Sequence, residues 1–178
     1  MITYKKLKTV WILILTYALF LAAGLLMGGC KDEGTGRLKI GDRVPDFTIV
    51  DLAGQTITSE MWGGSPVILR FWDTECKYCR ADSPIINHYF DTYQSRGLKV
   101  LYVATSSETV ERVSTFISDL DITFPVALYK DGKMAADDQV SLVPQTIFIS
   151  PDKKIITAIL GGVGEAELQE LLGPYLPQ

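Results

Sequence analysis

The sequence predicts an α/β domain in which a mixed central sheet is covered by helices on both faces, and three observations support this fold class. Residues 66–72 (PVILRFW) and 99–104 (KVLYVA) are apolar runs of strand length, which is typical of strands buried inside a sheet. A segment with helical signals follows each of these runs. The domain then ends on a hairpin-like pair of strands and a helix, within residues 146–172.

The expected strands are apolar or β-branched segments that lie between turn residues. In chain order they cover residues 47–52, 56–58, 66–72, 99–104, 124–128, 146–150 and 155–160. The first two flank Ala53-Gly54-Gln55 and should form a short hairpin. The last two flank residues 151–154 (PDKK), a sequence with strong turn preference.

Three helices are expected from their start and stop signals and from apolar periodicity. They cover residues 76–96, 108–120 and 165–172. The first contains Pro84, where the missing backbone donor should kink the helix, and Gly97 lies just past its end. Gly173-Pro174 ends the last one.

Length and charge exclude several classes of protein. A chain of 178 residues with 47% hydrophobic residues suits one folded domain plus an appendage. The formal charge is −4, and it becomes −7 without residues 1–29, which hold three lysines and no acid. An acidic body argues against a nucleic-acid partner and against a polybasic membrane-binding face.

The first 30 residues have the pattern of an export signal and membrane anchor. Residues 1–9 are basic, and residues 10–29 form a 20-residue stretch without a charge. About 20 apolar residues suffice to span a bilayer as a helix, and the lysines would stay on the cytoplasmic side. We therefore divide the chain into an anchor (1–30), a linker (31–38) and a folded domain (39–178) outside the cytoplasm.

Cys30 decides whether this anchor is cleaved. The residues before it, Leu26-Met27-Gly28-Gly29, resemble a bacterial lipobox, in which small residues precede a Cys that becomes lipidated. We expect Cys30 to carry lipid, and the alternative is an ordinary Cys at the end of an uncleaved anchor. In both cases the domain is tethered to a membrane and faces an oxidising compartment.

Cys76 and Cys79 are three residues apart where a buried strand is followed by a helix. On a first helical turn such residues lie on one face and can form a disulfide. The helix dipole and the unpaired N–H groups stabilise a thiolate on the first Cys. That thiolate can attack a substrate disulfide, and the second Cys can resolve the mixed disulfide. We therefore predict Cys76 as the nucleophile and Cys79 as the resolving thiol.

Two other uses of this pair fit the sequence less well. A structural zinc site needs four ligands, whereas the chain adds only one histidine, His88, for which a solvated or capped role is expected. A purely structural disulfide is disfavoured, because so short a loop has little effect on chain entropy. We expect neither a metal nor another cofactor.

Three motifs resemble the TlpA/ResA group of thioredoxin-like proteins. They are residues 41–47 (GDRVPDF), 67–79 (VILRFWDTECKYC) and 143–146 (VPQT). The resemblance covers about residues 40–176 and implies a thioredoxin fold with an extra N-terminal hairpin and a mid-domain insertion. It also implies that Pro144 is cis and packs against the cysteines, that the Val143 backbone pairs with a substrate chain, and that Trp72 supports the site.

The chain departs from this group at several positions. Relatives commonly have Trp where Glu75 precedes the first Cys, and an acid or Asn where Arg70 lies on the buried strand. Glu75 should oppose the thiolate, whereas Lys77 and Arg70 should favour it. Glu108 is the nearest candidate for the buried acid that assists proton transfer in relatives used in cytochrome c maturation. Its alternative role is a first-turn acid that complements the helix dipole.

The expected function is thiol–disulfide exchange, with a reductant of exported protein thiols, for example in cytochrome c maturation, as the preferred direction. Its partners would be protein dithiols or disulfides and an upstream membrane protein that donates electrons. Two alternatives stay open. A peroxiredoxin-type peroxidase shares the GDRVPDF motif but has Pro and Thr where this chain has Leu69 and Asp73. A copper-handling module would need a later His, and no histidine follows His88.

Overall fold

The computed structural model describes residue 14 and residues 39–129 and 142–176. Residues Leu38–Gln178 form one compact unit. Apart from residue 14, the predicted anchor with Cys30 and the linker 31–38 lie outside the described residues. Among the residues that are described, no helix has both the length and the apolar character needed to cross a bilayer.

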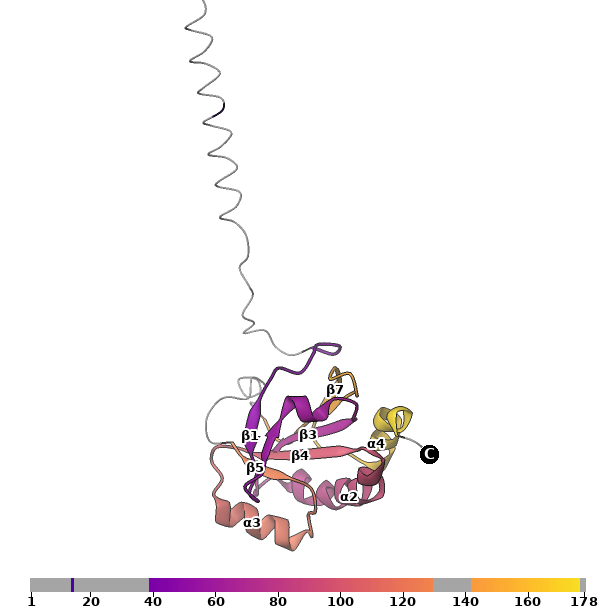
Figure 1. Ribbon diagram of the computed structural model, residues 1–178. Coiled ribbons are helices and arrows are strands. Elements are labelled where there is room, and N and C mark those ends of the chain that lie inside the picture. The colour runs from indigo at the N-terminus through magenta and orange to yellow at the C-terminus, as the bar shows by residue number, and fades with distance from the viewer. Residues whose placement is uncertain (1–13, 15–38, 130–141, 177–178) are drawn as a thin grey trace, which may run out of the picture. The chain divides into compact units, whose positions relative to one another are not determined.

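A five-stranded mixed sheet forms the centre of the domain, in the order β5-β4-β3-β6-β7 (Figure 1). Its strands are β3 (Val67–Trp72), β4 (Lys99–Ala104), β5 (Val126–Leu128), β6 (Gln145–Ile149) and β7 (Ile155–Leu160). Strand β4 runs parallel to β3 and β5, whereas β6 is antiparallel to both β3 and β7. The prediction of a mixed sheet is confirmed, and every residue of the central strand β3 is buried, as its continuous apolar run requires.

The expected N-terminal hairpin is present as β1 (Thr48–Val50) and β2 (Thr56–Thr58), followed by a 3-10 helix, η1 (Ser59–Trp62). The hairpin is joined to the central sheet at its edge, where the Leu52 N–H donates to the Val126 carbonyl. The preceding GDRVPDF segment runs beside the start of β7, since the Gly41 N–H donates to the Ile155 carbonyl. The GDRVPDF segment therefore belongs to the same domain as the central sheet and lies beside it.

Three α-helices are described: α2 (Lys77–Tyr93), α3 (Val110–Asp119) and α4 (Glu165–Leu172). All three pack on one face of the sheet, where Ile86, Phe116 and Leu168 join a single core with Trp72. The other face is covered by the hairpin and η1 through Phe47, Ile57 and Trp62. Figure 1 shows α2 and α3 on one side of the sheet and the β1 hairpin on the other. Helical segments thus lie on both faces of the sheet. The three α-helices cover the first face, and the 3-10 helix η1 lies with the hairpin on the second.

Two helix boundaries differ from the prediction. The segment 76–96 divides into α2 and a 3-10 turn, η2 (Gln94–Arg96), with Gly97 in the left-handed region at φ 100°. Helix α3 begins at Val110 with Thr109 as its N-cap, so Glu108 lies outside the helix. The alternative role of Glu108 as a first-turn acid is therefore wrong. In chain order, helix α3 and strand β5 lie between β4 and β6, in the middle of the domain, where an insertion was expected, and residues 130–141 of this stretch are outside the described part.

Candidate active site

Cys76 and Cys79 form a disulfide at the start of α2, with their Cα atoms 5.2 Å apart. Cys76 is the N-cap of the helix and has extended backbone angles, and its Sγ accepts a hydrogen bond of 3.1 Å from the Cys79 N–H. This N–H is one of the donors that a helix start leaves without a partner. The same contact would stabilise negative charge on Cys76 after reduction, because an N–H dipole favours an anion.

The two sulfur-bearing residues differ in access to solvent. Cys79 is fully buried and belongs to the core beneath α2, whereas Cys76 is only half-buried. Tyr78, between them, is 64% exposed and lies at the surface. A substrate sulfur can therefore approach Cys76 but not Cys79 without movement of the helix start.

The Val143–Pro144 peptide bond is cis, as the resemblance implies. Pro144 directly precedes β6, and in the antiparallel β3–β6 pair Gln145 lies opposite Phe71. Pro144 is therefore brought to the end of β3 from which the chain continues to Cys76. Pro144 is buried and Val143 is half-buried, and the Pro144 carbonyl accepts a hydrogen bond from the Gly161 N–H.

The loop before α4 forms another wall of this site. A Cβ atom placed on Gly162 would lie 3.6 Å from the Tyr78 ring and 3.8 Å from the Asp82 carboxylate. This loop therefore runs close to the helix that carries the cysteines. Leu142 and Leu160 are exposed by 62% and 61%. Together with Tyr78 they provide apolar surface on segments that adjoin the site.

Trp72 is completely buried, with its ring centroid 4.3 Å from that of Phe116 and 5.8 Å from that of Tyr102. Its ring packs α3 against the end of β3, and it has no surface left for contact with a substrate. Its Nε1 atom has no hydrogen-bond partner.

Glu108 lies against the turn that leads into Cys76. Its side chain is only 2% exposed, and Oε1 accepts hydrogen bonds from the Thr74 backbone N–H at 2.8 Å and from the Thr74 hydroxyl at 2.9 Å. Arg112, on the first turn of α3, donates to the Thr74 Oγ1 at 2.7 Å and to the Glu75 carboxylate at 2.6 Å. The structure thus brings Glu108 and Glu75 together around one arginine.

A buried ion pair lies beneath the same helix. Arg70 of β3 is 0% exposed, and its Nη2 donates to both carboxylate oxygens of Asp82 at 2.7 and 2.8 Å. Arg70 also donates to Thr146 Oγ1, and the Val163 N–H donates to Asp82. Burial raises the pKa of the Asp82 carboxyl, and the positive charge of Arg70 opposes this effect. Arg70 is thus engaged with Asp82, and its predicted assistance to the thiolate is offset by that carboxylate.

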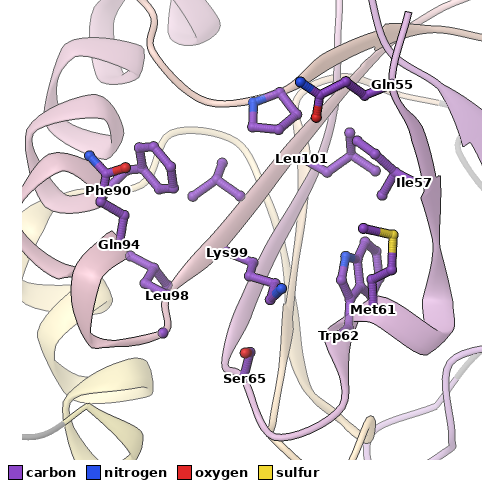
Figure 2. A pocket seen from close by; sticks show the side chains of 13 residues that line it. Gln55, Ile57, Met61, Trp62, Ser65, Phe90, Gln94, Leu98, Lys99 and Leu101 are labelled. Atoms are coloured by element: carbon purple, nitrogen blue, oxygen red, sulfur yellow. The ribbon is translucent and has the colours of Figure 1, made fainter.

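A cavity of about 440 Å³ lies at the opposite end of the strands. It is lined by residues of η1 such as Trp62, by the end of α2 and by the start of β4, including Lys99 (Figure 2). The six residues of β3 separate this end from the cysteines by roughly 15–20 Å. The cavity is therefore remote from the redox pair and takes no part in the site.

A mixed sheet with a disulfide at the start of a helix, an accessible first sulfur and a neighbouring cis-proline defines a thioredoxin-like thiol–disulfide oxidoreductase. A DsbE-like thiol:disulfide interchange protein from Chlorobium tepidum has the same fold, with a TM-score of 0.69, 25% identity and coverage of 79% of this chain and 99% of its own. The thiol-disulfide oxidoreductase ResA of Bacillus thuringiensis subsp. konkukian is 31% identical over 79% of this chain and 81% of its own. The ResA of Oceanobacillus iheyensis is 29% identical over 94% of this chain and 86% of its own.

A family model described as "AhpC/TSA family" matches residues 40–158 of this chain. The chain therefore belongs to the AhpC/TSA family and, within it, is a ResA-type thiol–disulfide oxidoreductase. Its relatives are named for thiol–disulfide exchange, which favours exchange over the peroxidase alternative.

Three residues that contact the site were not predicted from the sequence: Asp82, Thr74 and Arg112. Two of them had a detectable signal: Asp82 follows Cys79 by three residues on the same helix, and Arg112 follows Glu108 by four. His88 is exposed on α2. Over the described ranges, no group of three or more His, Cys, Asp or Glu side chains is gathered as metal ligands would be.

Proposed function

We propose that the protein reduces disulfides in exported proteins, with Cys76 as the nucleophile and Cys79 as the resolving thiol. The Cys76 thiolate attacks a substrate disulfide, a mixed disulfide forms, and one substrate thiolate leaves and takes up a proton. Cys79 then loses its proton and attacks the Cys76 sulfur, which releases the second substrate thiol. Two electrons and two protons pass to the substrate, and the Cys76–Cys79 disulfide remains.

The observation that carries this assignment is the asymmetry of the two sulfurs. Cys76 Sγ accepts the Cys79 N–H at the helix start, while Cys79 is fully buried. The first position favours a thiolate that substrates can reach, and the second protects the resolving thiol until a mixed disulfide has formed.

The test is trapping of the mixed disulfide. Cys76→Ser should abolish exchange, whereas Cys79→Ser should accumulate mixed disulfides through Cys76, because the resolving attack is missing. Peptide mapping by mass spectrometry of the complexes identifies the linked cysteine. If the Cys76→Ser variant forms complexes through Cys79 as fast as the Cys79→Ser variant forms them through Cys76, this assignment of nucleophile and resolving thiol is wrong.

Substrate chains are proposed to lie along Val143 and cis-Pro144, with their backbone paired to Val143 as an added strand. The exposed apolar side chains of Tyr78, Leu142 and Leu160 support this proposal, since they adjoin the same segments. Glu108 is proposed to exchange protons with the cysteine pair, because its carboxylate is almost fully buried beside the turn that carries Cys76.

The setting is proposed to be extracytoplasmic and membrane-anchored, with residues 1–30 as the anchor and Cys30 as the lipidation site. An upstream membrane protein with a reducing dithiol would return two electrons to the Cys76–Cys79 disulfide after each turnover. Apocytochrome c is one candidate substrate, in line with the resemblance to maturation proteins.

The direction of the reaction is tested by the potential of the Cys76–Cys79 couple, measured by equilibration with a thiol–disulfide buffer. A value near about −270 mV or lower fits the proposed reductant. A value near about −120 mV would make the protein an oxidant and overturn this direction while leaving the exchange chemistry intact.

A further inference from the structure

Arg112 joins the start of α3 to the turn that carries the redox pair. Its Nη2 atom donates to the Thr74 hydroxyl oxygen at 2.7 Å and to Glu75 at 2.6 Å, and its Nε atom lies 3.5 Å from Glu108. Thr74 in turn donates both its N–H and its hydroxyl to Glu108. One guanidinium therefore contacts two of the carboxylates near Cys76, those of Glu75 and Glu108.

The charges around Cys76 make this contact important. Asp73 and Glu75 belong to the turn itself, and Glu108 is packed against it. The cationic side chains on the neighbouring elements are Lys77 and Arg80 of α2, Arg112 of α3, and Arg70, which is paired with Asp82. Arg80 is engaged with Asp119 on the surface.

Glu108 and Glu75 depend on Arg112 in different ways. The Glu108 Oε2 atom is buried and has no hydrogen-bond partner, so the nearby guanidinium is the charge that compensates it. Glu75 is exposed and is held by Arg112 at 2.6 Å. Without Arg112, two carboxylates would oppose negative charge on Cys76, because like charges disfavour the ionised form of a group.

We propose that Arg112 is a positioning residue for thiol–disulfide exchange, whose positive charge offsets part of the negative charge of Glu75 and Glu108 and so keeps the Cys76 thiol acidic and reactive. The guanidinium fork suits this task, since it can bond two oxygens in fixed directions. This inference rests on the proposed assignment of Cys76 as the nucleophile. It also explains how the chain accommodates Glu75 directly before the first cysteine.

The test is the pH profile of alkylation of the fully reduced protein by iodoacetamide, with the labelled cysteine identified by peptide mapping. In Arg112→Gln the midpoint for Cys76 should move upward by roughly half to one pH unit. Adding Glu75→Gln to this variant should move the midpoint back toward that of the original protein, because one of the two opposing charges is then gone. Arg112→Lys keeps the positive charge and should shift the midpoint less than Arg112→Gln.

The matched control is Arg80→Gln, which removes an arginine with similar exposure from a surface ion pair with Asp119. It should leave the midpoint close to the original value. An unchanged midpoint in Arg112→Gln, or an equal shift in Arg80→Gln or Arg112→Lys, would overturn the proposal. Preferential labelling of Cys79 in the original protein would instead contradict the nucleophile assignment, so the two failures are distinguishable.

Discussion

At the scale of single residues, Glu108 shows how a surface-like sequence position becomes part of a buried site. The sequence around it, Thr105-Ser106-Ser107, is polar, and Ser106 and Ser107 are exposed. Glu108 itself turns inward, because the Thr74 N–H and hydroxyl satisfy one oxygen and Arg112 lies beside the other. This burial beside the turn that carries Cys76 supports the proposed role of Glu108 in proton exchange with the cysteine pair.

Glu108→Gln should slow exchange by about tenfold or more, because the amide keeps the Thr74 contact but cannot exchange a proton. The measurement is the rate of reduction of a model protein disulfide over a range of pH. Glu111→Gln, which removes an exposed carboxylate from the same segment, serves as the control and should keep the original rate. An unchanged rate in Glu108→Gln would mean that Glu108 only holds the turn.

At the scale of secondary-structure elements, the Arg70–Asp82 pair holds together the parts that form the site. Arg70 belongs to β3, Asp82 to α2 and Thr146 to β6, and the Val163 N–H comes from the loop before α4. The hydrogen bonds to Asp82 connect the helix with the cysteines to β3 and to the loop before α4, and the bond from Arg70 to Thr146 connects β3 to β6. The Arg70 guanidinium lies over the aromatic ring of Tyr102 of β4. Burial raises the pKa of the Tyr102 hydroxyl.

Asp82→Ala should lower the free energy of unfolding by about 3–5 kcal/mol, since it leaves the Arg70 charge buried without a partner. The double variant Arg70→Met with Asp82→Leu should recover most of this loss, because an apolar pair of similar size leaves no uncompensated charge. Urea unfolding measures both. As a control, Asp119→Ala breaks an exposed pair and should change stability by only about 0–1 kcal/mol.

Should the double variant be as unstable as Asp82→Ala, the ion pair would contribute through its hydrogen bonds to Thr146 and Val163 rather than through charge compensation. Thr146→Val would then be the next measurement, because only the Thr146 contact is made by a side chain.

At the scale of the whole molecule, the proposed anchor determines where exchange can take place. The domain beyond residue 38 has its own sheet, core and redox pair, so it has the parts of an exchange enzyme without the first 30 residues. A membrane tether would keep this enzyme close to a membrane-bound electron donor, which raises their effective concentration.

If Cys30 is the lipidation site, protein extracted from bacterial membranes should begin at Cys30 and carry the added mass of lipid. Intact-mass spectrometry measures this directly, and Cys30→Ser is the matched control, which should retain the N-terminal segment. A mass that includes Met1 without lipid would mean that the segment is an uncleaved anchor. The exchange chemistry of Cys76 and Cys79 does not depend on this result.

Local patterns in the sequence determined most of the fold. The apolar run 66–72 predicted the buried strand β3, and the segment 165–172 predicted α4 with the bounds that the structure has. Cys76 and Cys79 could be placed at a helix start because strand, turn and helix signals are all local. Side chains close in sequence interact through the same few backbone geometries in every protein, so their arrangement follows from spacing alone.

Only the tertiary structure decided which side chains surround the cysteines. Arg112 reaches Glu75 across 37 positions of the chain, Arg70 reaches Thr146 across 76, and Val163 reaches Asp82 across 81. Such contacts depend on how strands register and on which helix covers which face, and no local spacing encodes them. The redox pair was therefore visible in the sequence, and Glu108 and Arg70 were visible as single candidates. Their contacts with Arg112, Thr74 and Asp82 became visible only once the sheet had brought distant segments together.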